Sequence, residues 1–237
     1  MAERTAETLI SVDPPTIEHI TTEDDTPVDN LFSAKQQRLL VEPIYSSWDS
    51  HISRVADANV GIFRTPYTPP VVPDMFLSLD VEIAEDWYAK EHRSYFLWEF
   101  GKSPEVVIEI VSNRKGGETG KKMREYALLG VWYYAVYDPQ QLIQATPLQI
   151  YELRAGSYLL KQNPFLEEIG LGLTLWTGVY EGKENQWLRW CDAAGQVLPT
   201  GAELAERERQ RAEQEHQRAE RLAAQLRALG VNPDEIN

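Results

Sequence analysis

The strongest constraint on the fold is a strand, a helix and a second strand that follow one another between residues 106 and 137. Residues 106–111 form an apolar run, residues 118–129 carry an apolar stripe at helical spacing that ends at Gly130, and residues 131–137 form a second apolar run. A crossover of this length joins two parallel neighbours of one sheet. The sequence therefore predicts an α/β fold with a βαβ crossover inside the sheet.

Other segments predict the rest of the sheet. Ser33 is positioned to cap a helix that carries Leu39, Leu40 and Ile44. Residues 79–103, rich in Trp, Tyr and charge, are expected to run over the sheet. A hairpin is expected around residues 155–157. The further strands are expected at residues 58–63, 71–78, 148–153, 158–161, 173–180 and 187–191.

The charge pattern divides the chain into three parts. Residues 1–30 are polar, carry a formal charge of −7, and bury too little apolar surface to order themselves. Residues 31–199 are expected to form the α/β domain, with a formal charge of −5. Residues 200–237 carry −2 and form a C-terminal helix with heptad spacing.

Two interpretations of this C-terminal helix are open. Ala205, Ala212, Ala219 and Leu226 recur every seven residues, and Glu208, Glu215, Leu222 and Leu229 occupy the complementary positions. A solvated surface helix explains the polar half of the pattern. A weak coiled coil that pairs two chains through residues 201–229 explains the apolar half, because the three leucines need cover. We favour a homodimer.

Composition excludes several classes of protein. The chain has one cysteine, which excludes an intramolecular disulfide and the multi-cysteine zinc patterns, and its four histidines show no zinc spacing. The N-terminal residues carry no apolar signal core, and no apolar stretch is long enough to span a membrane. We expect a cytoplasmic protein without membrane contact.

Three charged residues occur where apolar ones are expected. Glu109 lies inside the run 106–111 and Asp74 inside the run 71–77, while Lys122 lies on the crossover helix, four residues before Tyr126. An ionised carboxylate buried in a strand costs several kcal/mol, roughly, unless a cation meets it. Lys122 and Tyr126 share one side of the helix.

These residues predict either a metal site or a buried ion pair. Asp74 and Glu109, with the backbone carbonyl of Ile110, offer the oxygen ligands that Mg²⁺ prefers, and Lys122 would orient water or balance charge. The alternative is a Glu109–Lys122 ion pair without a metal. Residue types alone favour neither.

The segments that carry these residues resemble those of a known family. The chain looks like a member of the Uma-type restriction endonuclease family, which belongs to the PD-(D/E)XK nuclease-like superfamily. The match covers residues 35–180 and rests on the order and spacing of its motifs. The matching segments are residues 72–74, 104–112, 122–126, 130–131 and 134–139.

The resemblance implies a restriction-endonuclease-like mixed sheet, with Asp74 and Glu109 as metal ligands and Lys122 as the third catalytic residue. In the wider superfamily a lysine follows the acid by two residues on the strand, and here that position is Val111. The Uma-type pattern instead has a lysine four residues before a tyrosine on the next helix, as in Lys122 and Tyr126. This agreement favours the metal site over the bare ion pair.

We therefore expect an endonuclease that depends on Mg²⁺ or Mn²⁺ and hydrolyses phosphodiester bonds of nucleic acid, with DNA as the expected substrate. The net charge of −14 argues against a general nucleic-acid binder, although half of it lies in residues 1–30. The alternative is a catalytically inactive nuclease-fold scaffold that oligomerises through residues 201–229 and binds protein partners.

Overall fold

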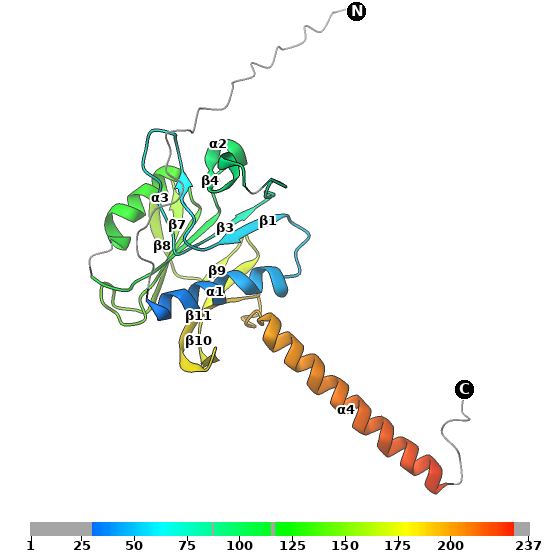
Figure 1. Ribbon diagram of the computed structural model, residues 1–237. Helices are drawn as coiled ribbons and strands as arrows, with labels where there is room; N and C mark the ends of the chain where they lie inside the picture. The colour runs from blue at the N-terminus through cyan, green and yellow to red at the C-terminus, as the bar shows by residue number, and fades with distance from the viewer. Residues whose placement is uncertain (1–29, 87, 115–116, 230–237) are drawn as a thin grey trace, which may run out of the picture.

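The structure is a computed structural model that describes residues 30–86, 88–114 and 117–229. Residues 1–29 of the predicted acidic tail lie outside the described residues, as do residues 230–237 at the C-terminal end. The described chain forms an α/β body from which one long helix projects (Figure 1).

The centre of the body is a six-stranded mixed sheet. Its neighbouring strands are, in order, β1 (Arg54–Asp57), β3 (Met75–Leu79), β5 (Val106–Ile110), β6 (Tyr133–Tyr137), β7 (Leu148–Arg154) and β8 (Ser157–Lys161). Strands β5 and β6 run parallel, and the other neighbours in this sheet run antiparallel. The predicted mixed α/β fold is confirmed, and it agrees with a restriction-endonuclease-like sheet.

The predicted crossover joins β5 to β6 through two helical segments. A π-helical turn, η2 (Glu118–Lys122), leads into α3 (Met123–Leu129), which ends at Gly130 with a φ of 89°. The left-handed backbone conformation directly after a helix is adopted most readily by glycine, so Gly130 correctly marks the end of this helix in the sequence. The π-helical first turn differs from the single α-helix expected, and it contains Gly120, a poor α-helix former.

Each face of the central sheet packs against its own core. Val106, Ile108 and Ile110 of β5 face the core that contains α1 (Leu31–Ser46) and a second sheet. Val107 faces the other core, which contains α3. Because successive strand residues point to opposite faces, Glu109 lies on the α3 face with Val107.

Helix α1 and the second sheet cover one face. The second sheet contains β9 (Phe165–Leu166), β10 (Leu171–Tyr180) and β11 (Lys183–Cys191), and β10 and β11 pair antiparallel along their length. The α1 cap differs from the expectation: the side chain of Asn30, rather than Ser33, accepts the first amides, and Ser33 is buried. The helix also continues through Pro43 to Ser46.

The region before and after β3 differs most from the sequence prediction. The strand expected at 58–63 is wrong, since β1 ends at Asp57, Asn59 turns with a φ of 57°, and only β2 (Ile62–Phe63) is extended. Between β3 and β5 lie η1 (Lys90–His92), β4 (Tyr95–Phe96) and α2 (Leu97–Phe100), and β4 pairs parallel with β2.

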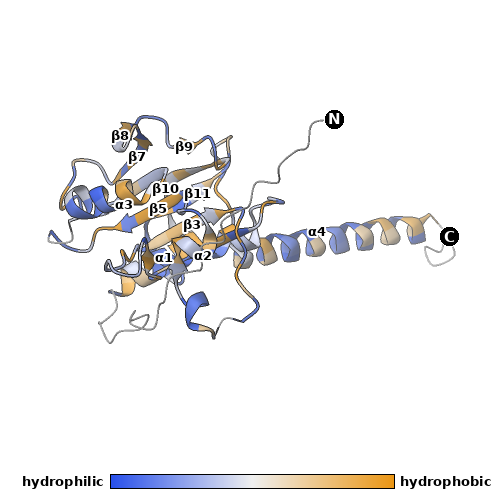
Figure 2. Ribbon diagram, turned by 90° about the horizontal axis from the view of Figure 1, so that it is seen from above, coloured by the Kyte–Doolittle hydropathy of each residue, from blue (hydrophilic) through white to orange (hydrophobic). Residues whose placement is uncertain are grey.

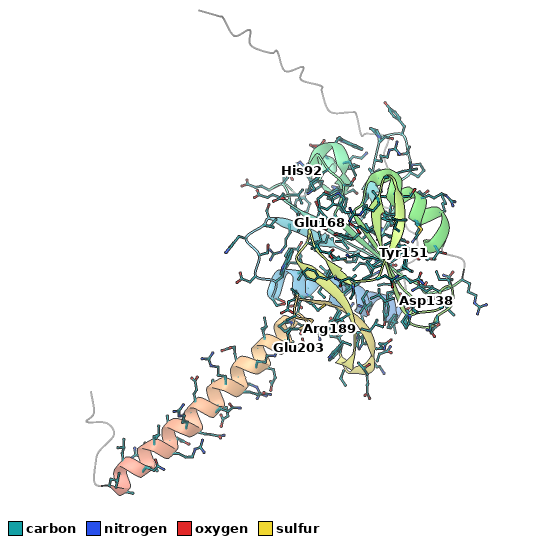
Figure 3. All side chains as sticks on the ribbon, turned by 180° about the vertical axis from the view of Figure 1, so that it is seen from behind. His92, Asp138, Tyr151, Glu168, Arg189 and Glu203 are labelled. Atoms are coloured by element: carbon teal, nitrogen blue, oxygen red, sulfur yellow. The ribbon has the colours of Figure 1, made fainter. Side chains whose placement is uncertain are left out.

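Helix α4 (Gly201–Ala228) projects from the body (Figure 1), and none of its residues is buried. Thr200 and Glu203 form a capping box at its first turn. Arg189 of β11, which is nearly buried, forms a bidentate ion pair with Glu203 where the helix meets the body (Figure 3). Hydrophilic and hydrophobic stretches alternate along α4 (Figure 2). Its predicted pairing with a second chain stays a prediction.

In the part of the chain that is described, no helix has the length and apolar character needed to cross a membrane.

Candidate active site

Glu109 is the centre of the candidate site. It is the fourth residue of β5, and its side chain is fully buried on the face that α3 covers. The strand forms because its remaining residues are valine and isoleucine, which favour a sheet buried on both faces. A carboxylate in this position must be matched by hydrogen bonds or positive charge.

Two side chains from the crossover helix meet Glu109. The amine of Lys122 donates to Oε2 at 2.7 Å, and the hydroxyl of Tyr126 donates to Oε1 at 2.6 Å. Lys121 instead points outward, is 80% exposed, and lies 3.5 Å from Glu125. The predicted i,i+4 relation of Lys122 and Tyr126 therefore brings both to one carboxylate.

Asp74 lies beside Glu109 at the start of β3. Met75 pairs with Ile108, so one further step of this antiparallel register places Asp74 opposite Glu109. Asp74 Oδ2 accepts a hydrogen bond of 2.6 Å from the amide of Ile110. The expected strand 71–78 begins later than predicted, at Met75, because Pro73 cannot donate to a strand ladder.

The backbone of Ile110 turns toward Asp74. The amide of Val111 donates to the carbonyl of Tyr137, so Val111 bonds toward β6. The backbone groups of successive strand residues point to opposite edges, so those of Ile110 point to the β3 edge. The carbonyl of Ile110 thus lies on the same edge as Asp74, where we expect a metal ligand.

Burial and charge set the protonation of this cluster. Burial raises the pKa of Glu109, and the charge of Asp74 raises it further, while Lys122 and Tyr126 lower it. Burial lowers the pKa of Lys122, but the charge and hydrogen bond of Glu109 together with the charges of Asp74 and Glu118 outweigh burial, so the net pKa is raised. Lys122 is therefore a stable cation beside Glu109.

The donor set fits a hard divalent cation. Mg²⁺ usually takes one or two carboxylates and keeps several waters. Asp74 is only partly buried, so solvent reaches this side of the cluster. Among the described residues no three His, Cys, Asp or Glu side chains form a metal-binding group. An ion here would therefore have Asp74, Glu109 and the Ile110 carbonyl as its protein ligands and complete its shell with water.

Sequence reasoning missed other residues at this site. Gln37 of α1 donates from Nε2 to Asp74 Oδ1 at 3.0 Å and to Asn59 Oδ1 at 3.2 Å. A glutamine one turn before Leu40 and two turns before Ile44, on the buried face of α1, was the available signal. Glu42, further along α1, instead accepts the amide of Gly201 at the start of α4.

Glu118 is a second residue for which the sequence predicted no role. Its side chain is 6% exposed, and its charge helps to raise the pKa of Lys122. Within the described part of the chain, its Oε2 has no hydrogen-bond partner. The backbone carbonyl of Glu118 accepts the hydroxyl of Tyr134, which fixes the turn that leads to Lys122.

Comparison with known proteins identifies the family. The model of the Uma2 family, described as "Putative restriction endonuclease", matches residues 23–178. This range contains Asp74, Glu109 and Lys122, and it ends before α4. No curated protein matches the chain. With the matched range covering more than half of its length, the chain belongs to the Uma2 family of restriction-endonuclease-like proteins.

Proposed function

We propose that the protein is an endonuclease that depends on Mg²⁺ or Mn²⁺ and hydrolyses phosphodiester bonds of nucleic acid. The observation that carries the proposal is the meeting of Lys122 with buried Glu109, beside Asp74, from three separate elements. Family membership supports a nuclease-like function. A bare ion pair would account for Glu109 and Lys122, but it would not account for the second carboxylate, Asp74, that the strand register places opposite Glu109.

The residues have distinct roles in this proposal. Asp74, Glu109 and the Ile110 carbonyl would hold the ion, which when bound supplies a Lewis acid for the phosphate and acidifies the attacking water. Tyr126 holds Oε1 of Glu109 and thereby fixes the plane of that carboxylate. Lys122, whose side chain is 30% exposed, orients the water and balances charge on the phosphate.

Exposed cations that neighbour Lys122 in the sequence support a polyanionic substrate. Arg114 and Arg124 are exposed and flank Lys122 between β5 and the end of α3. The net charge of −14 opposes nucleic-acid binding overall, so binding must depend on this local positive group. DNA is the substrate we propose first.

The direct test uses the full chain with Mg²⁺ or Mn²⁺ on double-stranded, single-stranded and structured DNA. We expect nicking or cleavage that chelation stops and that Glu109→Gln abolishes. Lys121→Met, at the outward-facing neighbour of Lys122, is the matched control and should retain activity. Lack of cleavage on all three substrates would overturn the proposal, as would cleavage that Glu109→Gln retains.

The second candidate function is a nuclease-fold scaffold that pairs through α4. The observation that favours it is the exposure of Leu222 on α4, 50%, and of Leu229 directly after α4, 77%, where the helix itself has no buried residues. Sedimentation of the full chain should then show a dimer that Leu222→Gln with Leu229→Gln converts to a monomer. Calorimetry separates the two candidates, because a live site binds Mn²⁺ and loses that binding in Asp74→Asn.

A further inference from the structure

Asp74 depends on its neighbours for its orientation. It lies directly before Met75, the first residue of β3. Each oxygen of its carboxylate accepts a hydrogen bond, Oδ2 from the amide of Ile110 and Oδ1 from Gln37. The Ile110 donor belongs to the backbone of β5, whereas the Gln37 donor is a side chain from α1.

The chemistry of Asp74 decides which way the Gln37 amide faces. An ionised carboxylate only accepts hydrogen bonds, so the NH₂ group of Gln37 must face it. The oxygen of Gln37 then faces Asn59, whose Nδ2 donates to it at 3.1 Å. Asn59 Oδ1 in turn accepts from Gln37 Nε2 at 3.2 Å. The two amides thus fix each other's orientation.

Asn59 is suited to this position by its backbone. Its φ of 57° is left-handed, a conformation that asparagine adopts more readily than most residues. Its amide donates to the carbonyl of Pro73 at 3.2 Å, directly before Asp74. Asn59 therefore holds the chain beside Asp74 with its backbone and orients Gln37 with its side chain.

The neighbouring residue Gln36 makes different contacts. Its Nε2 donates to the carbonyl of Leu188 at 2.8 Å, and its Oε1 accepts the amide of Leu188 at 3.0 Å. Gln36 joins α1 to β11, while Gln37 joins α1 to the candidate site. Both side chains are buried, so burial alone does not explain why Gln37 lies against Asp74.

We propose that Gln37, oriented by Asn59, is a positioning residue that holds the Asp74 carboxylate ready to bind the divalent ion. The proposal rests on the proposed metal-dependent function and assigns it two more residues. Partners of metal-binding carboxylates typically change metal affinity by about 10- to 100-fold when they are removed.

The test measures Mn²⁺ affinity of the full chain by calorimetry in Gln37→Met, Asn59→Gly and the double variant. Methionine keeps the length of the side chain without its donor, and glycine keeps the positive φ without the amide. We expect Gln37→Met to weaken Mn²⁺ binding about tenfold. Asn59→Gly should weaken it less, and the double variant should bind no more weakly than Gln37→Met, because Asn59 acts through Gln37.

Hydrogen exchange at the Ile110 amide gives a second measurement that needs no metal. If Gln37 holds Asp74, exchange at Ile110 accelerates in Gln37→Met while amides of β7 keep their protection. If exchange at Ile110 accelerates but the unmodified chain binds no Mn²⁺, the metal-dependent function is overturned while the positioning of Asp74 by Gln37 stands. If Gln37→Met changes neither the exchange at Ile110 nor the Mn²⁺ affinity, the role of Gln37 is overturned. If the losses of affinity add in the double variant, the role of Asn59 is overturned.

Discussion

Asp74 lies opposite Glu109, one step beyond the last residue pair of β3 and β5, and accepts a 2.6 Å hydrogen bond from the amide of Ile110. The two carboxylates are thus neighbours across strands, a pairing that repels when both are ionised. Their repulsion contributes to the raised pKa of Glu109. A divalent cation bound between the two carboxylates would offset this repulsion.

Lys122→Met should remove the cation from buried Glu109. We expect nuclease activity to fall by about 100-fold or more, because a donor positioned at developing charge is lost. The free energy of unfolding should fall by about 1–3 kcal/mol, since a buried charged group loses a hydrogen bond. Cleavage rates and urea unfolding measure the two effects. Equal losses in Lys121→Met would contradict the assignment.

Tyr126→Phe should weaken the site without opening a cavity. The substitution removes only the hydroxyl that donates to Glu109 Oε1. Above about pH 8, where Glu109 is ionised, we expect the free energy of unfolding to fall by about 1.5–3 kcal/mol, the usual range for a hydrogen bond to a charged group. Tyr158→Phe is the control, because its hydroxyl donates to the neutral carbonyl of Val131 and its loss should cost less. Urea unfolding of both variants measures the two losses, and a loss in Tyr158→Phe equal to that in Tyr126→Phe would contradict the prediction.

The central crossover could be predicted because several local signals agree there. The apolar runs, the helical stripe and Gly130 all specify β5, α3 and β6, and each signal lies within a few residues of the element it defines. Lys122 could be predicted for the same reason, since its spacing from Tyr126 is a local helical relation.

Other features depend on contacts between distant segments. The turn at Asn59 is fixed by Pro73 and Gln37, and neither neighbour can be read from residues 58–63 alone. The position of Gln37 depends on how α1 packs across the sheet onto Asp74. The length of β11 follows from its pairing with β10 rather than from its own polar first half. Tertiary contacts override local propensity at these positions.

Charge reversal beside the site should weaken nucleic-acid binding. Arg114→Glu and Arg124→Glu each change an exposed cation that flanks Lys122 in the sequence. Each substitution is made in the inactive Glu109→Gln background and should weaken DNA binding. The slope of log affinity against log salt concentration should fall in magnitude by about one for each phosphate contact that is lost. Fluorescence anisotropy at several salt concentrations measures this. Arg209→Glu on α4 is the control, and an equal effect there would mean that the cations act only through net charge.

Glu203→Gln should make the attachment of α4 less stable in a pH-dependent way. The hydrogen bonds and charge of Arg189 hold the pKa of Glu203 below its ordinary value of 4.5, against the opposing effect of burial. A carboxylate whose pKa is lower in the folded state stabilises that state above its unfolded pKa, and the contribution is lost as pH falls through the folded pKa.

The free energy of unfolding should therefore differ between the unmodified chain and Glu203→Gln by about 1–2 kcal/mol at pH 7, a figure reduced for the exposure of Glu203. The difference should shrink as the pH falls below 4.5. Arg189 is nearly buried and stacks on Trp176 at 4.7 Å, so its guanidinium cannot turn to solvent when Glu203 loses its charge. Thermal unfolding followed by circular dichroism across this pH range measures the difference. Glu206→Gln, whose partner Arg209 is exposed, should cause a smaller change, and a difference for Glu203→Gln that persists in acid would contradict the ionic origin of the effect.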